Sequence, residues 1–226
     1  MRRVLAVAAK APQPGKVKTR LLPFLAPEDA TELYKCFLKD TIVLMETVPA
    51  ADVVISYTPR GAEQFFEGIA SGRHRLLAQR GRDLGERLSF ALADLLADGY
   101  ESAAIMNSDS PTLPREYLKQ TFDLLAEPGD RVVLGPADDG GYYLIGLKRP
   151  DRRLFEGVTW STNLVLDQTL ERAQQIGLDV ALLPEWYDVD TPEDFERLKH
   201  ELQENKGAAR FTRRFLKELA KGKSGD

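Results

Sequence analysis

Cysteine and histidine are nearly absent from this sequence. Its 226 residues include one cysteine, Cys36, and two histidines, His74 and His200. A single cysteine excludes an intrachain disulfide and a cysteine metal cluster, and a chain without disulfides fits a reducing, cytoplasmic location. Because the histidines lie far apart in the sequence, we expect neither histidine-based catalysis nor a histidine zinc site.

Long apolar runs and a strong charge of one sign are also missing. No stretch has the length of a transmembrane helix, and the apolar run after Arg3 is too short for a signal peptide. The formal net charge is only −4, so we expect no nucleic-acid partner. The length fits one large domain, predicted over residues 1–204, followed by a basic tail over residues 205–226.

Short apolar segments alternate with amphipathic ones, which is typical of an open α/β sheet. Strands are predicted at residues 4–8, 52–57, 75–79, 103–106, 132–135, 142–147 and 180–183. Helices are predicted at residues 27–48, 62–70, 84–97 and 114–125. Two more are predicted, one that ends near residue 176 and one that starts at residue 192. Residues 207–222 have helical spacing too, and we expect this basic helix to pack on the domain or to join two copies as a homo-oligomer.

A loop dense in proline, glycine and positive charge follows the first strand, over residues 9–21. Its prolines stiffen the backbone, and Gly15 lets a ligand approach closely. The loop brings lysine and arginine side chains to a strand end, where open α/β sheets bind ligands. We expect it to hold the phosphates of a nucleotide, although a basic surface turn has a similar composition. The residues expected to take part are Ala9, Lys10, Pro14, Gly15, Lys18 and Arg20.

Two aspartates follow apolar strands and are candidates for a metal site. Asp109 comes after strand 103–106, and Asp190 precedes a helix start that Thr191 and Asp194 already cap. Mg²⁺ prefers one or two carboxylates together with phosphate oxygens. The pair could therefore hold one Mg²⁺ across a cleft; the alternative for Asp109 is to cap a turn before the next helix.

Three other segments have both a structural and a functional interpretation. Asp83 and Glu86 resemble a capping box, but the glycines and arginines around them suit a ligand-facing loop. Residues 138–141 read as a hairpin turn that leaves one carboxylate free as a base or substrate contact. Ser161 or Thr162 is a plausible N-cap, while Trp160 offers a flat apolar wall to a sugar or base.

Four segments taken together resemble the DUF2064 family of nucleotide-diphospho-sugar transferases, which are GT-A-like glycosyltransferases of the arsenosugar-biosynthesis type. The segments are residues 10–21, 83–87, 108–113 and 139–146. Residues 160–162 and 188–194 extend the resemblance, which covers the chain from the first strand to about Leu202. Together these motifs are specific to the family, and each alone would be weak.

The resemblance implies a GT-A fold, a three-layer α/β/α arrangement around a mainly parallel mixed sheet. It implies a divalent ion, Mg²⁺ or Mn²⁺, held by Asp109 and Asp190 against the phosphates of a nucleotide. The predicted nucleotide-binding residues then also include Gly85, Arg87 and Ser108. The predicted substrate residues are Asp138, Gly140, Gly141, Tyr142, Trp160 and Ser161, and the predicted catalytic residues are Lys18, Arg20 and Asp139.

Three functions remain open from the sequence. The first is glycosyl transfer from a nucleotide sugar to a small acceptor, which the family resemblance favours. The second is nucleotidyl transfer to a phosphorylated small molecule, as in the related phospholactate guanylyltransferases, and the strongly basic first loop favours it. The third is a non-catalytic nucleotide-binding module. In the first two cases the partners are a small-molecule nucleotide and its acceptor.

Overall fold

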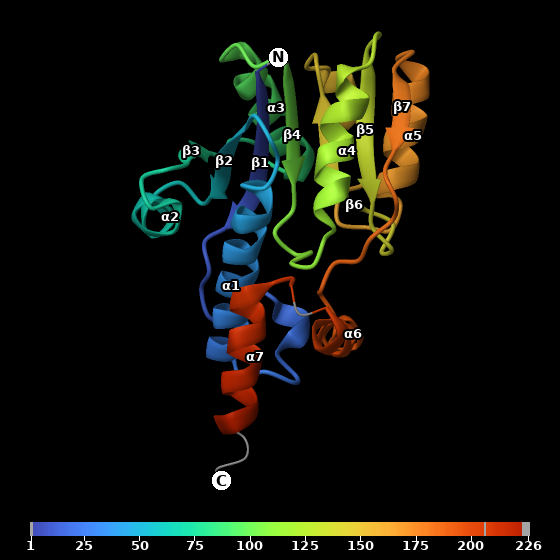
Figure 1. Cartoon of the computed structure of the whole chain (residues 1–226). Coiled ribbons are helices and arrows are strands. Elements are labelled where there is room, and N and C mark those ends of the chain that lie inside the picture. The colour runs from blue at the N-terminus through green and yellow to red at the C-terminus, as the bar shows by residue number, and fades with distance from the viewer. Residues whose placement is uncertain (1, 206, 223–226) are drawn as a thin grey trace.

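Seven strands form one mixed sheet in the order β3-β2-β1-β4-β6-β5-β7 (Figure 1). The computed structural model describes residues 2–205 and 207–222. Strand β6 runs antiparallel to its neighbours β4 and β5, and the other neighbouring pairs are parallel. The strands are β1 (Arg3–Lys10), β2 (Ala51–Thr58), β3 (Arg75–Ala78), β4 (Ser102–Met106), β5 (Arg131–Pro136), β6 (Tyr142–Leu147) and β7 (Asp179–Leu182). All seven predicted strands are confirmed.

The helices also agree with the sequence, with one clear exception at the start of α5. They are α1 (Pro27–Met45), α2 (Glu63–Ala70), α3 (Leu84–Ala97), α4 (Arg115–Ala126), α5 (Val165–Gln175), α6 (Pro192–Glu204) and α7 (Arg210–Gly222), with 3₁₀ turns η1 (Thr19–Leu21) and η2 (Arg152–Phe155). The prediction of a Ser161 or Thr162 cap is wrong, because Leu164 is the N-cap and no side chain caps it. The predicted caps of Asp83 on α3 and Thr191 on α6 are confirmed.

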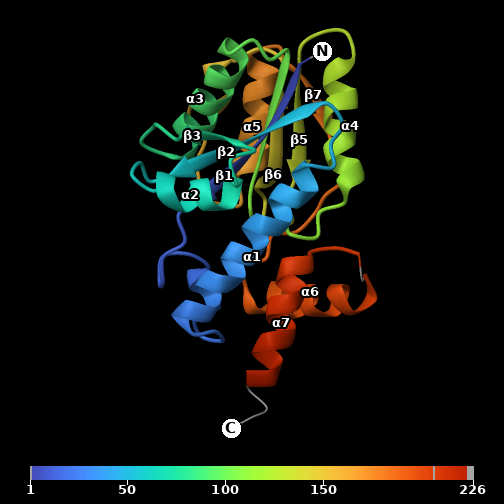
Figure 2. The ribbon, with the colours of Figure 1, turned by 60° about the vertical axis from the view of Figure 1, so that its left-hand side comes forward.

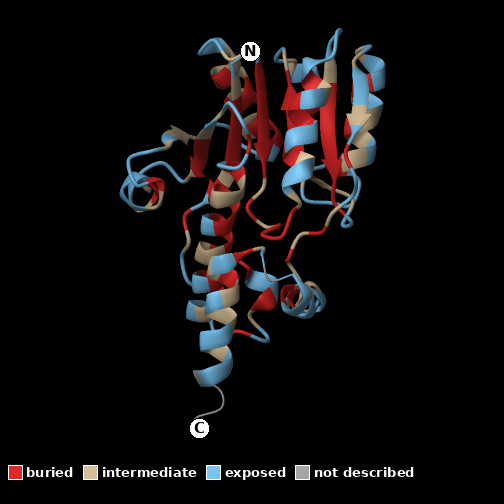
Figure 3. Cartoon of the chain, viewed as in Figure 1, coloured by how far each residue is buried: buried red, intermediate tan, exposed pale blue. Residues whose placement is uncertain are grey.

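Helices cover both faces of the sheet and make three layers. Alternate side chains of a strand point to opposite faces, so Leu5 and Val7 of β1 join one core and Val4 and Ala6 join the other. The first core contains α1, α2 and α4, and the second contains α3 and α5. Figure 3 shows the resulting buried sheet with exposed outer helix surfaces. The predicted three-layer α/β arrangement is confirmed.

A third core lies beyond one end of the sheet, where η1, α6, α7 and the first half of α1 meet (Figures 1 and 2). Its largest buried side chains include Leu21, Leu33, Phe37 and Tyr187. The carboxyl ends of β1 and β4 point toward this group of helices. Ligand sites of open α/β sheets lie at such strand ends.

Helix α7 packs on its own chain. The side chain of Asp40 on α1 accepts hydrogen bonds from the backbone N–H groups of Phe211 (3.0 Å) and Thr212 (2.8 Å) and from the Thr212 hydroxyl (2.7 Å). Apolar residues of α7 pack against the third core. Homo-oligomerisation through this helix and the division at residue 204 stay predictions. Within residues 2–205 and 207–222, no helix has the length and apolarity needed to cross a membrane.

Replacing Asp40 should loosen α7. The Asp40→Ala change leaves the first N–H groups of α7 without their acceptor, and we expect the free energy of unfolding to fall by about 1–3 kcal/mol. Urea denaturation followed by circular dichroism measures this. Asp123→Ala, at an exposed position on α4, is the control and should change the free energy by less than about 0.5 kcal/mol. Equal effects of the two changes would contradict the capping role.

Candidate active site

The segment that follows β7 crosses the carboxyl ends of the strands. Three backbone hydrogen bonds hold it there: Leu183 N to Leu134 O at 2.8 Å, Trp186 N to Pro136 O at 3.1 Å, and Val189 N to Asp109 O at 2.9 Å. The last of these places Asp188 and Asp190 beside the end of β4, where Asp109 lies. The two predicted metal ligands therefore come together although they are distant in the sequence.

The ammonium group of Lys18 lies between these two aspartates. It forms ion pairs with Asp109 Oδ1 and with Asp190 Oδ1, the latter at 2.9 Å, and it donates to the backbone carbonyl of Val189 at 2.8 Å. Only 3% of the Lys18 side chain is exposed. An ammonium has three N–H donors, so these three protein acceptors use all of them. In the structure the Lys18 ammonium thus contacts carboxylates, whereas the sequence predicted that it contacts a phosphate.

The charges of this group are tightly coupled. Burial alone would lower the pKa of Lys18, but Asp109 and Asp190 outweigh it and the pKa is raised. Burial raises the pKa of Asp109 against the attraction of Lys18. At Asp190, burial is outweighed by Lys18, with help from Arg20, and the pKa is lowered. The ammonium therefore stays charged at physiological pH.

A third aspartate, Asp188, lies next to this pair. Its carboxylate accepts hydrogen bonds from Asn107 Nδ2 (2.7 and 2.8 Å) and from the Ser110 hydroxyl (2.6 Å). Burial raises the pKa of Asp188 to about 7, and the charge of Asp109 adds to this shift. Neither Asp188 nor Asn107 was among the site residues predicted from the sequence. The signal was present in the Asp-x-Asp spacing, since alternate residues of an extended segment face the same side.

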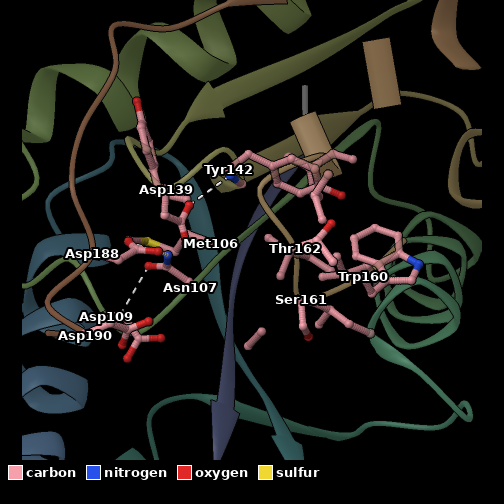
Figure 4. Close-up of a pocket in the computed structure, with 18 of the residues that line it drawn as sticks. Met106, Asn107, Asp109, Asp139, Tyr142, Trp160, Ser161, Thr162, Asp188 and Asp190 are labelled. Carbon is pink, nitrogen blue, oxygen red and sulfur yellow. Dashed lines mark hydrogen bonds between the residues drawn. The ribbon is translucent and has the colours of Figure 1, made fainter. Parts of the chain in front are cut away.

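A cavity of about 610 Å³ opens in front of these carboxylates. Asp109, Asp188 and Asp190 lie on one side of it, and Trp160, Ser161 and Thr162 lie on the other (Figure 4). Among its described lining residues, Arg20 is the one cation. The cavity therefore has an acidic end with a single arginine and an opposite end without a charged side chain.

The opposite end is built around the indole of Trp160. Phe155 stacks on it with ring centroids 6.4 Å apart and an interplanar angle of 22°, and Tyr142 meets it edge-on at 6.4 Å. Gly85, at the start of α3, lies so close that a methyl group there would overlap the indole ring. The ring is thus held on several sides and presents a fixed surface to the cavity.

The predicted site residues fall into two groups. Those that line the cavity are Arg20, Asp109, Asp139, Gly141, Tyr142, Trp160, Ser161 and Asp190. Those outside its lining are Ala9, Lys10, Pro14, Gly15, Lys18, Gly85, Arg87, Ser108, Asp138 and Gly140. The unpredicted lining residues include Asn107, Thr162, Asn163 and Asp188.

Several residues of the second group have structural contacts instead. The Ser108 hydroxyl is buried and lies 3.0 Å from the Tyr34 hydroxyl. The Asp138 carboxylate pairs with Arg197 of α6 at 2.9 Å. Gly140, at φ 85°, approaches the backbone of Asn163 so closely that a Cβ would overlap it. These contacts lie outside the lining of the cavity.

Mg²⁺ is compatible with the donor set of the acidic end. The two carboxylates supply hard oxygen ligands, and phosphate oxygens and water would complete an octahedron. Among the described residues, no group of three or more His, Cys, Asp or Glu side chains is arranged to hold a metal ion. A metal at Asp109 and Asp190 would complete its coordination with groups such as water and phosphate oxygens.

Comparison with solved structures defines the class of protein. A crystal structure described as a "putative nucleotide-diphospho-sugar transferase" from Desulfovibrio desulfuricans matches with a TM-score of 0.88 at 32% identity, over 96% of this chain and 95% of that chain. A cytidylyltransferase from Leptospira borgpetersenii shares the fold with a TM-score of 0.57 at 18% identity, over 99% and 96% of the two chains. The chain is a transferase with the nucleotide-diphospho-sugar transferase fold, as predicted.

Sequence comparison then gives the family. The family model described as "Uncharacterized protein conserved in bacteria (DUF2064)" matches residues 41–162. The chain belongs to the DUF2064 family, which confirms the resemblance seen in its motifs. A 2-phospho-L-lactate guanylyltransferase of Methanocella arvoryzae is 30% identical over 136 residues, which are 60% of this chain and 54% of that protein. The chain thus matches about half the length of this relative.

The contact between Gly85 and Trp160 can be tested directly. In Gly85→Ala the new methyl group forces the indole to move, and we expect the free energy of unfolding to fall by about 1–3 kcal/mol. Tryptophan fluorescence should shift at the same time. Gly68→Ala is the matched control, because a Cβ on that helical glycine meets open space. It should leave the emission unchanged and stabilise α2 by up to about 1 kcal/mol. A wild-type spectrum for Gly85→Ala would show that the contact does not constrain the ring.

Proposed function

We propose that this protein transfers a glycosyl group from a nucleotide sugar to a small acceptor, with Mg²⁺ or Mn²⁺ at Asp109 and Asp190. The observation that carries the proposal is the two-ended cavity. Its acidic end suits a metal-bound diphosphate, and its other end is lined by Trp160, Ser161 and Thr162. An aromatic side chain beside small polar residues suits the mixed apolar and polar surface of a sugar.

The acidic end would hold the leaving group. When bound, the divalent ion supplies Lewis-acid stabilisation of the diphosphate charge. Arg20 lines the same end and adds a fixed positive charge. Lys18 pairs with both carboxylates and offsets part of their charge. The roles of these residues in binding and catalysis are part of the proposal.

Asp139 is the favoured group for the acceptor hydroxyl. The sequence left Asp138 and Asp139 as alternatives, but Asp138 pairs with Arg197 outside the cavity lining. Asp139 lines the cavity, and its Oδ1 accepts a hydrogen bond from Gly141 N at 2.8 Å, which fixes the carboxylate. A fixed carboxylate can orient a hydroxyl group and accept its proton during transfer.

Nucleotidyl transfer is the second candidate function. The basic loop and the 2-phospho-L-lactate guanylyltransferase relative favour it. The charge of the cavity weighs against it, because a phosphorylated acceptor needs cations and the described lining offers only Arg20. A nucleotide-binding module without catalysis is the third candidate, and the transferase relatives disfavour it.

A ligand panel separates the first two functions. Thermal stability is measured with Mg²⁺ and, in turn, nucleotide sugars and nucleoside triphosphates at matched concentrations. A ligand at 100 times its Kd should stabilise the protein by about 2.7 kcal/mol. We expect the largest stabilisation from a nucleotide sugar. A triphosphate that exceeds every nucleotide sugar would point to nucleotidyl transfer, and no response to any nucleotide would contradict both enzyme proposals.

Removing one carboxylate tests the metal site. With a donor identified by the panel, Asp109→Asn should lower kcat by on the order of 100-fold or more, because the amide weakens the metal site beside the leaving diphosphate. The control Asp123→Asn removes a charge from an exposed position on α4 and should keep wild-type turnover. Unchanged turnover in Asp109→Asn would remove Asp109 from the proposed machinery.

A further inference from the structure

Lys18 occupies the position between Asp109 and Asp190 that a bridging cation would take. Its ammonium contacts Oδ1 of both carboxylates, and its third donor is used by the Val189 carbonyl. The ring of Phe37 lies 5.3 Å from the nitrogen and covers it from another side. The charge of the acidic pair is thus already partly balanced by a residue of the same chain.

The backbone of Lys18 is specialised for this placement. Its φ is 48° and its ψ is 41°, in the left-handed region that side chains other than glycine rarely adopt. Such a conformation is strained and persists only where the surroundings impose it. The contacts of the Lys18 ammonium with the two aspartates and the Val189 carbonyl offset this strain.

An ammonium and a divalent ion at the same two carboxylates repel each other. Mg²⁺ binds oxygen at about 2.0–2.1 Å, and a charged amine hydrogen-bonded to the same oxygen would lie within a few ångström of the ion and repel it strongly. We propose that Lys18 and a divalent cation compete for Asp109 and Asp190, so that Lys18 fills the site when no metal is bound. This rests on the proposed function only in placing a metal at these aspartates.

The competition couples metal binding to nucleotide binding. A released ammonium leaves three protein acceptors and needs new ones, and phosphate oxygens are strong acceptors for a lysine. Lys18 is the N-cap of the turn η1 in the basic loop. Four other residues of this loop, Gln13, Pro14, Gly15 and Lys16, are exposed. A divalent ion alone should therefore bind weakly. A nucleotide should strengthen the binding of the ion by more than its phosphate ligands alone would, because the phosphates also accept the released ammonium.

The first test measures Mn²⁺ affinity without nucleotide, by electron paramagnetic resonance of the free ion. Lys18→Met keeps an unbranched side chain and removes the ammonium, and we expect it to bind Mn²⁺ at least tenfold more tightly than the wild type. Lys16→Met removes the same charge from an exposed position in the same loop and should change the affinity less than twofold. Equal or weaker binding by Lys18→Met would overturn the competition.

The second test uses the wild-type protein and does not depend on the variant folding. Lysine acetylation mapped by mass spectrometry should find Lys18 protected in EDTA and increasingly reactive as Mn²⁺ occupies the site. Protection that persists or grows at saturating Mn²⁺ would overturn the proposal.

Asp109→Asn separates failure of this proposal from failure of the metal site itself. If Mn²⁺ binding survives that change, the ion binds elsewhere and the metal assignment fails. If Asp109→Asn abolishes Mn²⁺ binding but Lys18→Met has wild-type affinity, only the competition fails. The proposal requires loss of binding in the first variant and tighter binding in the second.

Discussion

The ion pairs of Lys18 with Asp109 and Asp190 join the first loop of the chain to its last crossing segment. Three carboxylates approach one another at this strand end, and without a nearby cation their repulsion would oppose the packing of the segment. Removing one partner of a buried ion pair is strongly destabilising, because it leaves a charge without compensation. The geometry of the cleft therefore depends on a positive charge at this point.

Main-chain hydrogen bonds and side-chain packing position the other side chains of the site. The crossing segment is tied to β5 and to Asp109 by main-chain hydrogen bonds, which place its aspartates beside the end of β4. On the opposite side, Trp160 is fixed between Phe155, Tyr142 and Gly85. One end of the cavity thus depends on main-chain hydrogen bonds and ion pairs, and the other depends on the packing of aromatic side chains; the proposed glycosyl transfer rests on this difference.

Much of the fold was accessible from the sequence, because it depends on local patterns. Apolar segments of four to eight residues located the strands, and the Thr191 cap fixed the start of α6. The start of α5 was missed because Ser161 adopts a left-handed backbone, with φ 65°, which is incompatible with the expected cap. No propensity rule signals such a conformation for serine.

Less of the site could be predicted from the sequence, since its residues contact partners that are far away along the chain. The sequence predicted a metal site at Asp109 and Asp190 and a phosphate contact for Lys18, and both stay predictions. The left-handed turn that brings the Lys18 ammonium to the two carboxylates is visible only in the folded chain. Asp188 was overlooked since its environment is made by Asn107 and Ser110, far away in sequence. Asp138 and Asp139 could be told apart only by Arg197, which comes from another helix.

The cap that Asp40 provides for α7 has a consequence for biosynthesis. During synthesis, the N-terminal part of a domain emerges first and can begin to fold before the rest exists. Helix α1 carries a carboxylate whose hydrogen-bond donors, at Phe211 and Thr212, are synthesised 171 and 172 residues later. Until then Asp40 lacks these donors, and the face of α1 that packs against α7 is open to solvent. Arrival of α7 completes the packing of this face.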